Sequence, residues 1–188
     1  MRDRDTPIAI ACTTRAPARS TDMKLFAIYV GGEHPRAHIE IHDMRFVVAD
    51  TITDTHAALR EQWWGTPGTL HIDCWAVIDH ADGYNVTLRP ERWTGAERLY
   101  YVNLGGYDPT DFAEQHRNMF VVATSLSRAK AKAIEAVAGW KDAHRDDMYE
   151  AEQAFALDTM VGEQLHIHLT PSLPARPLKF KCSYKPLK

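Results

Sequence analysis

The stretch that decides the fold occurs twice: Lys24–Ala49 reads KLFAIYVGGEHPRAHIEIHDMRFVVA, and Arg98–Ala123 reads RLYYVNLGGYDPTDFAEQHRNMFVVA. The two segments align without a gap at a constant offset of 74 residues. Ten of the 26 aligned pairs are identical: Leu25/Leu99, Gly31/Gly105, Gly32/Gly106, Pro35/Pro109, Glu40/Glu114, His42/His116, Phe46/Phe120, Val47/Val121, Val48/Val122 and Ala49/Ala123. Such density of identity within one chain indicates an internal duplication, which constrains every later step of a fold prediction.

The residues around the repeat predict the same order of elements in both copies. Hydrophobic periodicity gives the first copy strands over 24–30 and 38–42, a helix over 54–64, and strands over 70–79 and 84–88. An Asp-Gly turn joins the last two strands. The second copy has the matching strand over 110–116, a helix over 128–140 with Ser127 as its expected N-cap, and a strand over 164–169. Residues 110–116 also fit a helical turn, and the repeat favours the strand.

These elements predict an α+β fold made of tandem pseudo-symmetric β-β-α-β-β repeats packed as one body. The expected divisions are a disordered N-terminal extension over 1–22, repeat 1 over 23–89, a linker over 90–97, repeat 2 over 98–170, and a Pro-rich segment with a C-terminal strand over 171–188. Met23 directly precedes the first strand, and we expect it to be the natural start of the protein.

Composition excludes several classes of function. The 188 residues are 45% hydrophobic and 25% charged, which is typical of a globular protein with a substantial core. The formal net charge is −3, and the sequence has no long run of basic residues. Both observations argue against nucleic acid and against an anionic membrane surface as partners. Three widely spaced cysteines form no metal-binding or disulfide pattern, so we expect reduced cysteines, a buried Cys74 and a cytoplasmic protein.

Two pairs of polar residues recur in both copies and are the main candidates for a site. The first copy has Glu40 with His42 and His71 with Asp73. The equivalents in the second copy are Glu114, His116, His144 and Asp146. Because residues i and i+2 of a strand face the same side, each pair would present an imidazole and a carboxylate together.

Three interpretations of these pairs stay open. They could be a hydrogen-bonded network that fixes the nearby turns, a carboxylate–imidazole pair for proton transfer, or ligands of a divalent transition metal. The candidate metal ligands are Glu40, His42, His71 and Asp73. His38 adds a third histidine to the first copy, and its equivalent in the second copy is Phe112. No catalytic residue is assigned.

Paired glycines end the first strand of each copy and are binding candidates of a second kind: Gly31, Gly32, Gly105 and Gly106. They permit a tight turn, which is the expected role, or close approach of a ligand to the backbone. His166 and His168 resemble a ligand pair, but the equivalent residues in the first copy are Asn85 and Thr87. We therefore expect these two histidines on a solvated face.

The repeated pattern resembles a known bacterial family. Its features are Leu-Phe, Gly-Gly, Glu-x-His and Phe-Val-Val-Ala, then a helix, then His-x-Asp, and in the second copy Leu104-Gly105-Gly106-Tyr107 with His116 and Val121-Val122-Ala123. This pattern is similar to the family known as domain of unknown function 1543, whose members have one or two copies of the unit. The resemblance covers Met23 to the C-terminus and implies the architecture without an activity.

Three functions follow as alternatives. The favoured one is a module that binds a small molecule or a protein in the groove between the repeats. The second is a metal-dependent or acid–base enzyme that uses the repeated Glu-x-His and His-x-Asp residues. The third is a structural protein that pairs free sheet edges to form a homo-oligomer.

Overall fold

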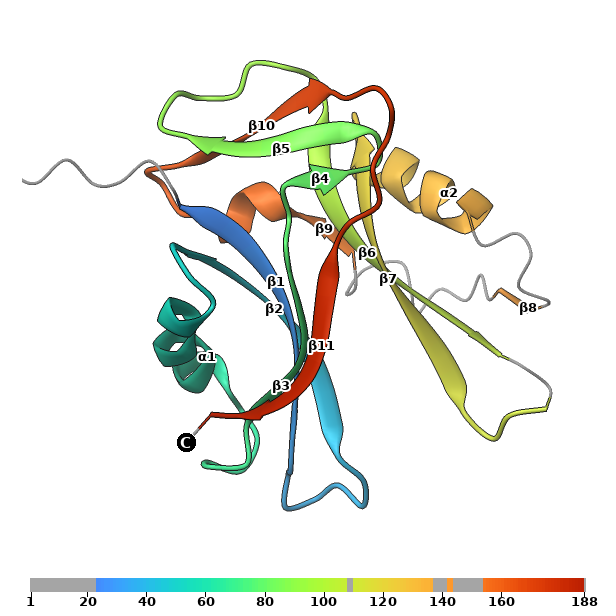
Figure 1. Ribbon diagram of the computed structural model, residues 1–188. Helices are drawn as coiled ribbons and strands as arrows, with labels where there is room; N and C mark the ends of the chain where they lie inside the picture. Colours follow the sequence, from blue (N-terminus) through green and yellow to red (C-terminus); the bar gives the residue numbers. More distant parts are fainter. Residues whose placement is uncertain (1–22, 108–109, 137–141, 144–153, 188) are drawn as a thin grey trace, which may run out of the picture.

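The described part of the chain forms three antiparallel sheets and two α-helices, which confirms the α+β class (Figure 1). This computed structural model describes residues 23–107, 110–136, 142–143 and 154–187. None of the helices within these ranges is long and apolar enough to cross a membrane.

The first sheet has the strand order β11-β3-β1-β2. Its strands are β1 (Lys24–Gly32), β2 (Ile41–Ala49), β3 (His71–Val77) and β11 (Phe180–Pro186). Side chains alternate between the two faces of a strand, so Phe26, Ile28 and Val30 of β1 share one face. They pack there with Leu59 of helix α1 (His56–Gln62), which follows the 3-10 turn η1 (Thr53–Thr55).

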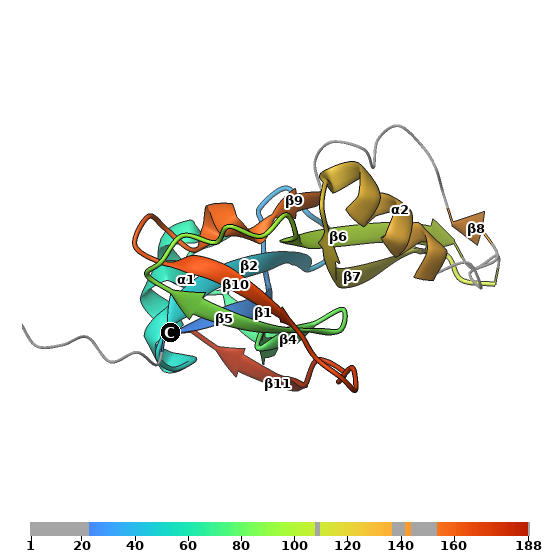
Figure 2. The same cartoon turned by 90° about the horizontal axis from the view of Figure 1, so that it is seen from above.

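The second sheet is built around the hairpin of β6 (Arg98–Tyr107) and β7 (Glu114–Ala123). Two short strands, β8 (Asp142–Ala143) and β9 (Ala154–Ala156), pair with β6 at different points. Tyr100 and Val102 pack with Val121 beneath helix α2 (Leu126–Ala136), which contributes Ala129 and Ala133. The two helices lie at opposite ends of the molecule, as Figure 2 shows from above.

A third sheet, of order β10-β5-β4, connects the two halves of the chain. It contains β4 (His80–Ala81), β5 (Tyr84–Arg89) and β10 (His166–Pro171), the last of which follows the 3-10 turn η3 (Leu157–Met160). Asp82 and Gly83 both have positive φ, so the predicted Asp-Gly turn is present between β4 and β5. Val86, Ile167 and Leu169 are buried, so alternate residues of these two strands form their inner face.

The inner faces of the two hairpins meet in the largest hydrophobic core. Leu25, Ala27 and Phe46 from the first hairpin pack with Leu99, Tyr101 and Val122 from the second. Both hairpins have the same register, because Gly31 pairs with His42 and Gly105 pairs with His116. The identical register agrees with an internal duplication, which stays a prediction from the sequence.

The second strand of each hairpin begins later than the sequence predicted. Residues 38–40 form a bend, and β2 begins at Ile41; residues 110–113 form a turn and bends, and β7 begins at Glu114. Alternation of polar and apolar residues therefore extended the predicted strands too far into the loops. Helix α2, in contrast, begins earlier than predicted, at Leu126. The Ser125 hydroxyl accepts a hydrogen bond from the Arg128 amide, so Ser125 caps this helix instead of Ser127.

Cys74 and Cys182 form a disulfide that joins β3 to β11. The two residues are direct partners in the antiparallel ladder, with their Cα atoms 4.1 Å apart. The expectation of reduced cysteines is therefore wrong for this pair. A separation of 108 residues concealed the contact, which exists because β11 returns to the edge of the first sheet.

Candidate functional site

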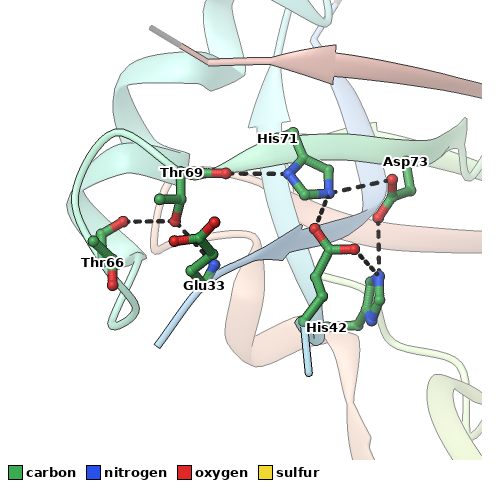
Figure 3. Close-up of polar contacts among 7 residues, drawn as sticks. Glu33, His42, Thr66, Thr69, His71 and Asp73 are labelled. Atoms are coloured by element: carbon green, nitrogen blue, oxygen red, sulfur yellow. Dashed lines mark hydrogen bonds and ion pairs between the residues drawn. The ribbon is translucent and has the colours of Figure 1, made fainter. Parts of the chain in front are cut away.

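His71 is the buried centre of a polar cluster at the lower end of the first sheet. It begins β3 directly opposite Gly31 of β1, and its side chain is only 2% exposed. The His71 Nδ1 atom lies 3.1 Å from the Thr69 carbonyl oxygen (Figure 3). Because a carbonyl only accepts hydrogen bonds, Nδ1 carries the hydrogen, and Nε2 points into the cluster.

Glu40 and His42 reach this cluster from the start of β2. The Glu40 Oε1 atom lies 3.0 Å from His71 Nε2, and the Glu40 Oε2 atom lies 3.6 Å from His42 Nε2. Glu40 belongs to the bend before the strand, and its side chain is 47% exposed. The carboxylate thus bridges the two imidazoles from the solvent side.

Asp73 closes the cluster from β3. Its Oδ1 atom lies 3.4 Å from His71 Nε2, and its Oδ2 atom lies 3.5 Å from His42 Nε2. His71 Nε2 and Asp73 Oδ2 are both buried, and neither makes an aligned hydrogen bond to the residues that the structure describes. Two imidazole nitrogens and two carboxylates therefore converge without satisfying one another (Figure 3).

Gly31 leaves the space that the cluster occupies. A Cβ atom at this position would lie 2.5 Å from His71 Nε2, 2.9 Å from Asp73 Oδ2 and 3.0 Å from His42 Cδ2. The close approach of side chains to the backbone thus explains this glycine. Gly32 has a different neighbour, because its Cβ would lie 2.5 Å from the Trp63 ring.

The protonation of His71 decides what the cluster can hold. With the hydrogen on Nδ1, the Nε2 lone pair of a neutral ring would face two carboxylate oxygens. This repulsion is removed by a proton between the ring and a carboxylate or by a cation between the groups. Glu40, His42 and His71 offer ligand atoms that all lie within 4.8 Å of one another.

The donor set fits a divalent transition metal. Imidazole nitrogen and carboxylate oxygen bind zinc at about 2.0–2.2 Å, which places neighbouring ligands of a tetrahedral site about 3.4 Å apart. Within the group Glu40, His42 and His71, the carboxylate lies 3.0 Å from the imidazole nitrogen of His71 and 3.6 Å from that of His42, and Asp73 adds contacts of 3.4 and 3.5 Å to the same nitrogens. The Thr69 carbonyl would orient the metal-binding ring of His71, as outer partners of ligating histidines usually do.

Two tyrosines cover the histidines. The Tyr29 ring stacks on His42 with a centroid distance of 5.3 Å, and the Tyr184 ring lies 4.4 Å from that of His71. Burial raises the pKa of Tyr29, and the charges of Asp73 and Asp43 raise it further. Its hydroxyl therefore stays protonated at neutral pH. Tyr184 comes from β11, two residues beyond the disulfide-bonded Cys182.

The equivalent residues of the second hairpin form a less complete group. His116 Nε2 lies 3.6 Å from Glu114 Oε2, which repeats the pairing in the first hairpin. The His116 Nδ1 atom contacts Asn103 Oδ1 at 2.9 Å, and both residues are on the inner face. Gly105 and Gly106 lie in β6, while His144 and Asp146 are outside the described residues.

A polar cavity of about 660 Å³ lies between the inner faces of the two hairpins. Its walls come from both hairpins and from β9: Tyr29, Ile39, His42, Asp43, Met44, Phe46, Tyr101, Asn103, Glu114, His116, Asn118 and Phe155. His42 and His116 thus line the same space. Burial strongly raises the pKa of Tyr101, whose hydroxyl donates a 2.6 Å hydrogen bond to Asn118.

The remaining histidine candidates are elsewhere. His38 is exposed in the bend before β2 and lies outside the Glu40/His42/His71 ligand group. His168 contacts the Glu91 carbonyl oxygen at 2.7 Å and packs edge-on against Trp93. Neither His166 nor His168 is fully exposed, so the solvated face predicted for them is partly covered by the segment before β6.

The sequence analysis did not identify the residues that contact the two histidines of the cluster from outside it. Thr69 orients His71, and its hydroxyl also accepts a hydrogen bond from the Glu33 amide. Tyr29 and Tyr184 have no counterpart of the same type at an equivalent repeat position, so the duplication could not identify them. Tyr184 reaches His71 because β11 pairs with β3, and the sequence did not reveal this pairing.

Residues 37–88 match the family model described as Domain of Unknown Function (DUF1543). This stretch contains Glu40, His42, His71 and Asp73. The chain belongs to this family. The family assignment confirms the resemblance found in the sequence, while the two copies of the unit in this member stay a prediction.

The chain is also similar to a protein of known structure. That structure is a crystal structure of a protein Il1583 from Idiomarina loihiensis, with 31% sequence identity and a TM-score of 0.67. The similarity covers 89% of this chain and 99% of the other. No curated protein matches the chain. The fold is therefore shared over nearly the whole length of this relative.

Proposed function

We propose that this protein of the DUF1543 family binds a divalent transition metal through Glu40, His42 and His71, with Asp73 as the fourth group. The buried Nε2 atom of His71 carries the proposal. Its neighbour Nδ1 is committed to the Thr69 carbonyl, so Nε2 presents a lone pair to three other potential ligands. A metal ion satisfies all four groups together, whereas a single proton satisfies one or two contacts.

The exposure of the four residues gives the site a closed and an open side. His71 is buried and Asp73 is only 25% exposed, whereas Glu40 and His42 face the solvent. Catalytic zinc sites commonly have three protein ligands and one open position. Water or a substrate bound at such a position would be reached from the side of Glu40 and His42.

Metal analysis of the tag-free full chain tests this proposal. We expect one zinc or cobalt ion per chain, and cobalt should give the visible spectrum of a four-coordinate site. His71→Ala should abolish stoichiometric binding, whereas His38→Ala should retain it because His38 is exposed and outside the cluster. Equal binding by His71→Ala and the unmodified chain would refute the assignment.

The polar cavity supports a second function, the binding of a small ligand between the hairpins. The specific observation is that His42 belongs both to the cluster and to the cavity wall. A metal held by His42 would therefore border a space of about 660 Å³, large enough for a small molecule. This arrangement supports a binding module first, and a metal-dependent or acid–base enzyme as the alternative.

Exogenous ligands of the cobalt-loaded protein test access to the metal from the cavity. Azide or acetohydroxamate should change the cobalt spectrum, and Asn118→Trp should reduce the change because a larger side chain would fill the cavity. A spectrum insensitive to both ligands would indicate a closed structural site and would contradict the second function. No step of catalysis is assigned to a particular residue.

The cytoplasmic location expected from the sequence is a separate proposal, and the redox state of Cys74 and Cys182 tests it. Disulfides persist mainly in oxidising compartments. Mass spectrometry of the native protein after rapid thiol alkylation measures the state of Cys74 and Cys182. Alkylated thiols would support the cytoplasm, and an intact disulfide would support an oxidising compartment. Light scattering measures the homo-oligomer that the third alternative requires.

A further inference from the structure

A second cavity, of about 700 Å³, continues from the polar one. The two share Tyr29, Met44, His116 and Asn118. Away from these shared residues, the second cavity extends between the first sheet, β7 and the segment 176–180. Its surface is there largely apolar, with Ala27, Trp75, Ala76, Met119, Phe120, Leu178 and Phe180. The metal proposal uses none of these residues.

The charged groups of this apolar cavity are mainly positive. Arg117 and Arg176 line it, and the acidic residue in its wall is Asp82. Asp82 forms an ion pair with Lys132 and accepts a 2.7 Å hydrogen bond from the Val122 amide. The charge of Asp82 is therefore balanced within the protein, and the cation that we consider for an anion in this cavity is Arg176.

Arg176 is held in place by two acceptors. Its Nη2 atom lies 3.2 Å from His80 Nδ1 and 3.0 Å from Asn85 Oδ1. His80 is only 2% exposed, so it provides a fixed support for the guanidinium group. Both contacts use Nη2, and Nη1 and Nε of Arg176 have no partner among the residues that the structure describes. Each of these two atoms has a hydrogen that it can donate to a carboxylate oxygen.

We infer that this cavity binds a small apolar molecule with one carboxylate, such as a medium-chain fatty acid or an aromatic acid. The carboxylate lies against Arg176, and the apolar body lies along Trp75, Phe120 and the two small residues Ala27 and Ala76. An apolar cavity with few polar groups is the usual form of a small-molecule site. This inference goes beyond the metal site and requires no metal.

Calorimetric titration of the metal-free full chain with decanoate tests the inference, with decanol as the uncharged comparison. We expect one decanoate per chain and weaker binding of decanol. Arg176→Gln should weaken decanoate binding about tenfold, since a hydrogen-bonded charge pair contributes on that scale. Lys179→Gln is the matched control, because Lys179 is an exposed cation three residues away that does not line the cavity.

A second variant tests the location without removing a charge. Ala136 is exposed at the end of α2 and lines the cavity, so Ala136→Trp should fill the space with little effect on folding and should reduce binding of decanoate. Circular dichroism verifies the fold of each variant. Three results would overturn the inference: no binding of decanoate, equal binding of decanol, or unchanged binding in both Arg176→Gln and Ala136→Trp. Each can occur whether or not the chain binds a metal.

Discussion

The two long hairpins pair their strands identically but differ in what flanks them. β1–β2 and β6–β7 place a glycine opposite a histidine at equivalent positions, Gly31 with His42 and Gly105 with His116. In the first sheet, β3 runs beside β1 and adds His71 and Asp73. Besides its hairpin partner β7, the described strands that pair with β6 are the short strands β8 and β9. A shared hairpin thus supplies half of a site, and the third strand supplies the other half.

The residue that contacts each histidine from the first strand differs as well. His42 lies against the Tyr29 ring, whereas His116 contacts the side-chain oxygen of Asn103, the residue equivalent to Tyr29. An aromatic neighbour leaves the ring nitrogens of His42 available for the cluster. An amide oxygen engages one nitrogen of His116. One hairpin therefore contributes its histidine to the proposed metal site, and the other forms the facing wall of the cavity.

The largest expected difference between the hairpins is in metal affinity. His71→Ala should weaken zinc binding roughly 100-fold or more, since changes in outer partners alone commonly cost 10–100-fold. His116→Ala should leave the affinity nearly unchanged, because His116 lies outside the Glu40/His42/His71 ligand group. Competition with a chromophoric chelator measures both values. A similar loss in the two variants would show that the two hairpins contribute equally to one site.

The second largest difference concerns the disulfide, which ties β11 only to the first sheet. Cys182→Ser should lower the free energy of unfolding by about 2–4 kcal/mol, because a link across 108 residues restricts the unfolded chain. A dithiol reductant should destabilise the unmodified chain and leave the variant unaffected. The lower global stability should speed hydrogen exchange in both sheets, and loss of the link between adjacent strands should add a further increase in β3 and β11. Uniform acceleration across both sheets would contradict a local role.

Local patterns were sufficient to predict the hairpins and the repeated pairs. Alternating residues placed β1, β5 and β10, and the Asp-Gly pair placed the turn before Tyr84. Glu40, His42, His71 and Asp73 could be named because residues of the same types recur in the second copy, 74 residues later for the first pair and 73 residues later for the second. The sequence could not show that all four converge, because the convergence depends on β3 lying beside β1 with Gly31 opposite His71.

Long-range pairing was the part that could not be predicted. β11 follows a Pro-rich stretch and carries exposed side chains, so its pattern does not reveal which sheet it joins. Its partner β3 lies about a hundred residues earlier, and neither the Cys74–Cys182 link nor the contact between Tyr184 and His71 follows from spacing. The predicted starts of β2 and β7 were wrong for a local reason. Polar and apolar residues can alternate through a bend that forms no hydrogen bonds to a neighbouring strand.

A smaller effect is expected where β1 approaches the cluster. Gly31→Ala would place a methyl group 2.5 Å from His71 Nε2, so the ring or the strand must move. We expect a loss of about 1–3 kcal/mol in stability together with weaker metal binding. In a His71→Ala background the same change should cost much less, because the main clash is absent. Equal costs in both backgrounds, measured by urea unfolding, would place the strain elsewhere.

The smallest expected effect is at the start of the hairpins, where Arg98 replaces Lys24. Arg98 Nε lies 3.7 Å from Asp158 Oδ2, which is buried and makes no hydrogen bond to the described residues. Burial raises the pKa of Asp158, and the charge of Arg98 only partly opposes the shift. The protonated carboxyl is therefore favoured by folding, and that contribution is lost as the pH rises through the pKa of the folded state.

Asp158→Asn should accordingly increase stability at pH 7, and the gain should shrink as the pH falls below about 4, the ordinary range for an aspartate. We expect no more than about 0.5 kcal/mol, since the group is partly exposed. Asp50→Asn is the control at the first hairpin, because Lys24 Nζ donates there to the backbone oxygen of Asp50. Thermal unfolding at pH 4 and pH 7 measures both. A loss of stability in Asp158→Asn at pH 7 would show that the ion pair with Arg98 outweighs the cost of burying the carboxylate.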